Sequence, residues 1–302
     1  MTDNMNDKKT VVALGKFDGM HIGHVKLLET AVKTAKENKA LSMVCFIGFA
    51  RQSLADEGQI QSIARDIGVD MLHRQELTPE FMNMSAREFV SEFLCKRFNC
   101  SHVVAGYNFR FAKGRSAGAE ELSQLCSEYG IECIIIPEVT VKADGKTLPV
   151  SSTLIRELVT GGEVKKIKDF LGRFYSVSGK VTHGRHLGST LDFPTANIIP
   201  PKELVLLPAG VYVTVTEIDK KRYLSVTNIG NNPTVADDNA VTVETFVFDF
   251  SNDIYGKNIT VHFLEKIRGE VKFSSLDELK NQVEQDKGYA FSKKEQYKEY
   301  MI

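Results

Sequence analysis

The hydrophobic pattern of this chain changes near Leu171, and that change restricts it to folds with two unlike halves. Up to about Arg156, short apolar runs alternate with stretches of helical spacing, which is typical of βαβ units around a parallel sheet. After Leu171, short β-branched or aromatic runs separated by Gly, Asn, Asp or Pro favour a small antiparallel barrel or sandwich. The chain has 302 residues, enough for two domains, and we place these at residues 1–168 and 169–302.

Individual runs predict individual elements. In the first half we expect strands at residues 11–15, 41–49, 101–106 and 131–139, with helices after the first strand and at 85–98 and 119–130. In the second half we expect strands at 175–184, 210–219, 222–230, 240–250 and 259–269. Residues 153–173 have a helical pattern that Gly161 and Gly162 break, and Ser275 with Glu278 forms a candidate capping box for a final helix.

Composition excludes several classes of protein. The chain is 42% hydrophobic and 25% charged, as in ordinary globular proteins, and its net charge of -1 argues against a nucleic-acid-binding or lipid-binding surface. No apolar run approaches the ~18 residues of a membrane span, and the polar start does not resemble a signal peptide, so we expect a cytoplasmic protein without a membrane partner. The five cysteines form no CxxC pair, which favours buried free thiols over disulfides or zinc.

The segment "GKFDGMHIGH", residues 15–24, joins a strand to a helix and has two histidines three residues apart. Gly15, Gly19 and Gly23 let the backbone approach a phosphate, and a helix start presents N–H groups and a positive dipole end to an anion. His21 and His24 add N–H donors, so the segment suits nucleotidyl transfer. The alternative is that one histidine caps the turn and the other is exposed.

A second phosphate-binding candidate is "SSTLIRE", residues 151–157, where a loop enters a helix. The hydroxyls of Ser151, Ser152 and Thr153 can cap that helix or contact a ligand, and from spacing alone the two roles stay equally open. Arg156 offers a guanidinium for triphosphate oxygens.

The second half has its own candidate, "GKVTHGRHLGSTLDFPTANI" at residues 179–198. Gly184 and Gly188 suggest a loop that wraps phosphates. The side chains of Thr195 and Asn197, two apart in an extended segment, can point the same way and offer oxygen ligands that suit Mg²⁺.

Glu244 is a single acid in an otherwise apolar strand pattern, "VTVETFVFDF". Alternation puts it on one face with Phe246 and Phe248, an environment that favours a catalytic carboxylate. The alternative, an outward-facing strand residue, remains open because one sequence does not assign strand faces to core or solvent.

Taken in order, these segments resemble the bacterial riboflavin kinase/FAD synthetase family over nearly the whole chain. "GKFDGMHIGH", "GYNFRFAKGRSAG" and "SSTLIR" resemble its nucleotide-site segments. The resemblance implies a Rossmann-like nucleotidylyltransferase domain in which the FMN phosphate attacks the α-phosphate of ATP. On this basis His21, His24 and Arg156 are the catalytic candidates, and the nucleotide-binding candidates are Gly15, Phe17, Asp18, Gly19, Asn108, Ser151, Ser152 and Thr153.

For the second half the resemblance implies a small antiparallel β-barrel, a riboflavin kinase domain that uses ATP and Mg²⁺. Glu244 falls on the family's general base, Thr195 and Asn197 on its magnesium ligands, and Arg268 in "KIRGEVKF" is a flavin-binding candidate whose default alternative is a surface arginine. The nucleotide-binding candidates here are Gly179, Gly184, Gly188, Thr195 and Asn197.

Two departures from the family pattern lie in the first half. The family's proline-histidine-proline segment is replaced by "CFIGFARQSL", and Ala112 stands in place of a glycine. Asn108 replaces an aspartate of many members, a milder change. We therefore expect a bifunctional enzyme that converts riboflavin to FMN and FMN to FAD. The alternatives are a riboflavin kinase with an altered first domain and a non-catalytic flavin-binding regulator.

Overall fold

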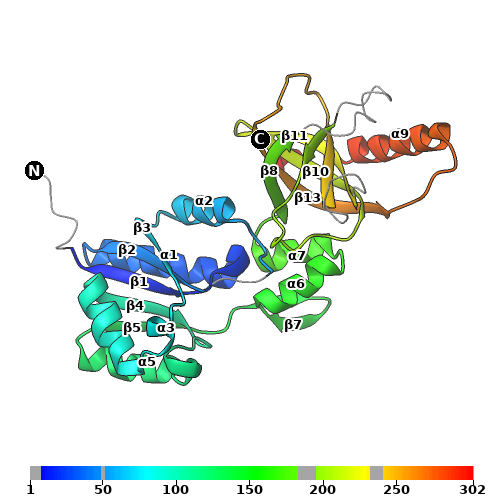
Figure 1. The fold of residues 1–302 in the computed structure, drawn as a ribbon. Coiled ribbons are helices and arrows are strands. Elements are labelled where there is room, and N and C mark those ends of the chain that lie inside the picture. The colour runs from blue at the N-terminus through cyan, green and yellow to red at the C-terminus, as the bar shows by residue number, and fades with distance from the viewer. Residues whose placement is uncertain (1–7, 49–51, 183–194, 232–240, 302) are drawn as a thin grey trace, which may run out of the picture. The chain divides into compact units, whose positions relative to one another are not determined.

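A computed structural model describes residues 8–48, 52–182, 195–231 and 241–301. The chain forms two compact units (Figure 1), one of Met1–Ser53 with Glu57–Ser152 and the other of Leu54–Asp56 with Thr153–Ile302. The division after Ser152 precedes the predicted domain boundary at residue 168, because residues 153–168 cluster with the second unit.

The first unit is built on a parallel sheet of β1 (Thr10–Gly15), β2 (Leu41–Ile47), β3 (Met71–Gln75), β4 (Cys100–Gly106) and β5 (Glu132–Ile136). The spatial order is β3-β2-β1-β4-β5 and every pairing is parallel. From β1 the chain therefore adds β2 and β3 on one side of the sheet and then β4 and β5 on the other, so the strand order reverses between β1 and β4. In such sheets a ligand crevice lies at the carboxyl ends of the strands at that reversal, here beyond β1 and β4.

Helices cover both faces of this sheet (Figure 1). Val11 and Ala13 of β1 pack under α1 (Ile22–Glu37) and α2 (Glu57–Ile67), whereas Val12 and Leu14 pack under the π-helical Phe89–Arg97 and α5 (Ala119–Glu128). Short helices α3 (Pro79–Met82) and α4 (Ala86–Glu88) precede the π-helical segment. All five cysteines are free. Cys45, Cys100 and Cys126 are buried in the cluster that contains Val12 and Leu14, as predicted, whereas Cys95 and Cys133 are half-buried against it.

Several elements of the first unit were not predicted. These are α2, the short helix α3, the edge strand β3, and a hairpin of β6 (Thr140–Ala143) and β7 (Lys146–Pro149). In β3 and the hairpin most side chains are exposed or half-buried. The apolar pattern that identifies a strand buried on both faces is therefore absent.

The second unit contains a closed barrel that follows two short helices, α6 (Ser152–Thr160) and α7 (Val164–Leu171). The helices separate at Gly162, whose φ of 73° is left-handed, as the glycine pair predicted. The strands are β8 (Ser176–Thr182), β9 (Ala196–Ile198), β10 (Gly210–Ile218), β11 (Lys221–Asn231), β12 (Val241–Val247) and β13 (Asn258–Gly269), in the order β10-β11-β12-β9-β8-β13. Five were predicted, and β9 is the short addition that closes the barrel.

The final helix α9 (Leu276–Ser292) lies against the outside of the barrel. Its Ala290 is fully buried in a cluster with Val213, Val226 and Phe246 from three strands. Ser275 caps the helix by accepting the N–H of Glu278, but the Glu278 carboxylate returns to Ser274 instead of Ser275. Only half of the predicted capping box is therefore formed.

Candidate active sites

The turn after β1 is built from residues with left-handed backbone angles. Phe17, Gly19 and Met20 have φ values of 51°, 73° and 45°. Phe17 is fully buried, and a Cβ at Gly15 would lie 3.1 Å from its ring. The Phe17 side chain therefore supports the turn from beneath, and its predicted nucleotide contact could come only through its backbone.

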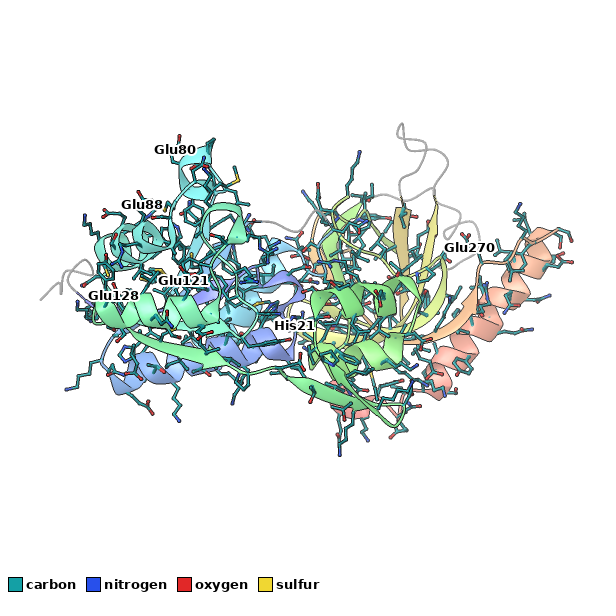
Figure 2. The ribbon with its side chains drawn as sticks, turned by 90° about the horizontal axis from the view of Figure 1, so that it is seen from below. His21, Glu80, Glu88, Glu121, Glu128 and Glu270 are labelled. Atoms are coloured by element: carbon teal, nitrogen blue, oxygen red, sulfur yellow. The ribbon has the colours of Figure 1, made fainter. Side chains whose placement is uncertain are left out.

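The two histidines form a stacked pair at the start of α1, which Figure 2 labels at His21. Their ring centroids are 3.6 Å apart with an interplanar angle of 16°. His21 caps the helix, because its Nδ1 accepts the backbone N–H of His24 at 3.2 Å. A neutral His21 in this arrangement has its proton on Nε2, which makes Nε2–H the hydrogen-bond donor of the ring. Capping and ligand donation, which the sequence left as alternatives, are thus compatible in one residue.

Gly23 explains why the motif needs a glycine between the histidines. A Cβ at this position would lie 3.2 Å from both Cε1 and Nδ1 of His21. His24 in turn meets the edge of the Phe17 ring at a centroid distance of 5.3 Å. The first turn of α1 contains no acidic residue, so the positive end of its dipole is not offset within the helix. This helix start is suited to an anion.

The structure brings together two of the predicted segments, which are far apart in sequence. The Ser152 hydroxyl donates to the backbone carbonyl of Asp18 at 3.1 Å. Ser53 donates to the Asp18 carboxylate at 3.2 Å, and Asp18 is only 5% exposed. Ser151 immediately precedes α6, whereas Thr153 and Arg156 lie within it and belong to the second unit. The ligand roles of these residues stay predictions.

Asn108 and Ala112 follow β4, whose carboxyl end borders the predicted crevice. Asn108 is exposed, and its Oδ1 would lie 3.3 Å from a Cβ at Gly106. Ala112, which replaces the family's glycine, has φ 64° and ψ 177°, a conformation that almost only glycine adopts without strain. The alanine has therefore kept the glycine-like backbone at this position. The other departure falls partly on residues 49–51, outside the described part of the chain.

In the barrel, a polar row crosses four neighbouring strands. Directly opposite one another stand Thr182 of β8, Asn197 of β9, Glu244 of β12 and Asn228 of β11. Opposed residues in antiparallel strands share a face with Cβ atoms ~5 Å apart. Sequence analysis identified Asn197 and Glu244 separately, and the strand register places them side by side.

The Thr195 and Asn197 side chains do point toward one another. Asn197 Nδ2 lies 3.4 Å from the Thr195 hydroxyl and 3.3 Å from the Thr195 carbonyl. Glu244 is half-buried and shares its face with Phe246 and Phe248, as the alternation predicted. This face is the outer one, since Phe246 packs in the cluster that α9 covers.

Arg268 is not the surface arginine of the default alternative. It donates to the buried Asp286 of α9 from Nε at 3.1 Å and from Nη2 at 2.7 Å, and its side chain is 20% exposed. Gln282 also donates to Asp286, at 3.0 Å. This ion pair connects α9 to β13. The sequence did not predict the contact, because the two residues are 18 positions apart.

Of the glycines predicted to bind a nucleotide in the second half, only Gly179 lies in the described part of the chain. A Cβ at Gly179 would lie 3.2 Å from Cβ of Ile198, so this glycine allows β8 to pack closely against β9. Its nucleotide contact stays a prediction. Gly184 and Gly188 lie outside the described residues.

Comparison with known proteins assigns both halves. A family model described as FAD synthetase matches residues 3–154, and one described as riboflavin kinase matches residues 171–293. The bifunctional riboflavin kinase/FMN adenylyltransferase of Listeria monocytogenes is 30% identical over 94% of this chain and 92% of its own length. The protein of the same name from Escherichia coli K12 is 32% identical over 91% and 90%.

One solved structure, titled Macrolide-efflux Protein from Streptococcus pneumoniae, matches with a TM-score of 0.82. It covers 95% of this chain and 96% of its own at 29% identity, so it shares the fold. Within the described residues, every helix is either too short or too polar to cross a membrane. Because two family models match in succession and the relatives align over nearly their full length, the chain belongs to the bifunctional riboflavin kinase/FMN adenylyltransferase family.

Proposed function

We propose that this protein phosphorylates riboflavin with ATP to give FMN and then adenylylates FMN with a second ATP to give FAD. The observation that carries the kinase half is the register of the barrel, in which Glu244 stands opposite Asn197, whose Nδ2 lies 3.4 Å from the Thr195 hydroxyl. A candidate base thus adjoins candidate oxygen ligands. For the adenylyltransferase half, the hydrogen bond from Ser152 to Asp18 joins two candidate nucleotide-site segments.

In the kinase reaction Glu244 accepts the proton of the riboflavin 5′-hydroxyl while the hydroxyl oxygen attacks the γ-phosphorus of ATP. The bond between the γ-phosphorus and the bridging oxygen breaks, and ADP leaves. A positioned carboxylate is required because a free hydroxyl is a poor nucleophile. The half-buried setting of Glu244 beside Phe246 supports this role.

Thr195 and Asn197 would hold Mg²⁺ through their hydroxyl and carboxamide oxygens. The donor types fit, because hydroxyl and carboxamide oxygens are hard ligands that suit this ion. The two side chains are neighbours, since Asn197 Nδ2 donates to the Thr195 hydroxyl at 3.4 Å. When bound with ATP, the ion offsets charge on the phosphate oxygens.

In the adenylyltransferase reaction a phosphate oxygen of FMN attacks the α-phosphorus of ATP, and pyrophosphate leaves. The start of α1, His21 Nε2–H and His24 would stabilise the negative charge on the α-phosphate, with Arg156 as a further phosphate contact. Such sites act by positioning and electrostatic stabilisation. We place the protein in the cytoplasm, where its five free cysteines would remain thiols.

The proposal is tested by incubating the purified protein with riboflavin, ATP and Mg²⁺ and separating the flavins by chromatography. FMN and FAD together are expected. FMN alone would indicate riboflavin kinase activity without adenylyltransferase activity. The absence of both products would indicate a flavin-binding protein that is not a catalyst.

Two variants test whether the sites are separate. Glu244→Gln should abolish FMN formation while supplied FMN is still converted to FAD. His24→Ala should depress FAD formation and leave FMN formation unchanged. If either substitution removed both activities from a folded protein, independent sites would be contradicted.

A further inference from the structure

Two cysteines of the first unit meet where α5 joins β5 (Figure 1). Cys126 lies in the last turn of α5 and is fully buried, and Cys133 is the second residue of β5 and is half-buried. The connecting turn is tight, because the N–H of Ile131 donates back to the carbonyl of Cys126 at 2.9 Å. The chain therefore returns directly from one cysteine toward the other.

Both side chains are on the face of the sheet that α5 covers. Cys133 and Ile135 alternate along β5 and pack against the cluster in which Cys126 is buried. A side-chain hydrogen bond joins Cys126 to Cys133. The two sulfur atoms are therefore neighbours, as the formation of a bond between them requires.

The two thiols differ in reactivity. The hydrogen bond from Cys126 lowers the pKa of the Cys133 thiol and outweighs the opposing effect of burial, and Ser123 contributes a second hydrogen bond. The same contact raises the pKa of Cys126, and burial raises it further. Because the thiolate is the nucleophilic form of cysteine and must be reached from solvent, Cys133 is the reactive thiol of the pair.

The other three cysteines lack this arrangement. Burial raises the pKa of Cys45 and of Cys100 to about 12 in each case, and both side chains are buried. Cys95 is half-buried like Cys133, but burial raises its pKa as well. Cys95 is therefore a reference with partial exposure and without a stabilised thiolate.

We propose that hydrogen peroxide oxidises Cys133 and Cys126 to a disulfide, with Cys133 reacting first and Cys126 resolving the product. The Cys133 thiolate attacks one peroxide oxygen and the O–O bond breaks. A sulfenic acid forms, and the departing hydroxide becomes water with the proton that Cys133 released. This modification is independent of the proposed flavin chemistry.

In the second step the Cys126 sulfur attacks the Cys133 sulfur. The sulfur–oxygen bond breaks, the disulfide forms, and the hydroxyl group leaves as water with the thiol proton of Cys126. In total the two thiols lose two electrons and two protons, and one peroxide becomes two molecules of water. Without an oxidant both residues stay thiols, as the structure has them.

Oxidation of Cys133 also favours the second step. The contact with Cys133 is the largest cause of the raised pKa of Cys126, and it ends when the Cys133 thiol is consumed. The attack is intramolecular, between side chains that already pack in one cluster. A small-molecule thiol restores both cysteines by exchange.

The test treats the full-length protein with hydrogen peroxide, blocks the remaining thiols and maps them by mass spectrometry. Trypsin releases both cysteines in one peptide, Ser116–Lys142, because no Lys or Arg lies between Arg115 and Lys142. The oxidised peptide should be lighter by two hydrogen atoms, take up no blocking group and recover both thiols in a reductant. Cleavage after Glu128 and Glu132 separates the two cysteines, so only a disulfide keeps them together.

The variants assign the two roles. Cys126→Ser should leave Cys133 as a sulfenic acid that a 1,3-dione probe captures, and Cys133→Ser should leave Cys126 a thiol. Cys95→Ser is the matched control and should form the disulfide at an unchanged rate. In the unmodified protein at neutral pH, Cys133 should be consumed about tenfold faster than Cys95, because more of it is thiolate. Thermal melting verifies that each variant is folded.

Consumption of Cys133 and Cys95 at equal rates would overturn the proposal, because exposure alone would then decide which thiol reacts. Pairing of Cys133 with Cys100 would also overturn it, as would sulfinic acid at Cys133 beside an unreacted Cys126. These comparisons are made in the unmodified protein, so they hold even where a serine variant fails to fold.

Discussion

The glycine between the two histidines allows the geometry of the first site to be tested by one methyl group. In Gly23→Ala the added Cβ would lie 3.2 Å from Cε1 and Nδ1 of His21 and 3.9 Å from Cβ of Val139. Carbon atoms pack best at about 3.5–4.0 Å, so the imidazole must retreat by roughly half an ångström. This movement disturbs both the cap on the His24 N–H and the stack with the His24 ring.

The expected effects on activity and stability differ in size. Displacing a catalytic group by about 1 Å costs on the order of 100-fold in rate, so about half that displacement predicts roughly tenfold slower FAD formation. Loss of the cap costs about 1 kcal/mol, while alanine in place of glycine in a helix gains up to about 1 kcal/mol. The free energy of unfolding should therefore change by less than about 1 kcal/mol.

The assay follows conversion of supplied FMN and ATP to FAD, with FMN formation from riboflavin as the internal reference. Gly288→Ala is the matched control, because Gly288 is also in a helix and a Cβ there would meet nothing within 4 Å. The control should gain up to about 1 kcal/mol in stability and keep both activities. Unchanged FAD formation by Gly23→Ala would refute the argument that the His21 ring position matters.

Three further predictions concern stability. Ala112→Gly should raise the free energy of unfolding by about 1 kcal/mol in urea denaturation, because relief of strain at φ 64° exceeds the entropic cost of glycine; lower stability would contradict that strain. Burial, with the Arg222 and Arg173 charges, lowers the pKa of His262 to about 3. Between about pH 6.5 and pH 3 the unfolded chain therefore binds more protons than the folded chain. In that window the free energy of unfolding falls by up to about 1.4 kcal/mol for each unit by which the pH is lowered, a slope that His262→Gln should remove from denaturation curves. Arg268→Lys should lower the melting temperature by several degrees, because lysine cannot reproduce the paired donors to buried Asp286.

Local sequence rules predicted those strands and helices in which burial makes apolar residues recur at a regular spacing. Strands β1, β2 and β4 appear as apolar runs because both faces of the sheet are covered there. The edge strand β5 also has an apolar run, although most of its side chains are only half-buried. The break at Gly162 and the cap at Ser275 were also predictable, since each depends on one residue's backbone or hydroxyl. The edge strand β3 was missed because three of its five residues, in the sequence MLHRQ, are polar or charged and no apolar run is present.

The candidate sites depended more on the resemblance to a family than on local rules. Periodicity placed Glu244 with Phe246, and the position of "HIGH" at a helix start indicated an anion site. Periodicity did not indicate that Ser152 contacts Asp18, or that Arg268 is paired with Asp286. Those contacts join segments with no short-range signal between them.

The sequence by itself determined which residues could do chemistry and which elements would hold them, because caps, turns and alternation act over a few residues. Tertiary structure alone decided which of these residues meet. The register of β9, β12 and β11 aligns Asn197, Glu244 and Asn228, and a shift of one residue would turn the whole row to the other face. That register is set by pairing between distant strands, so no local stretch of sequence contains it.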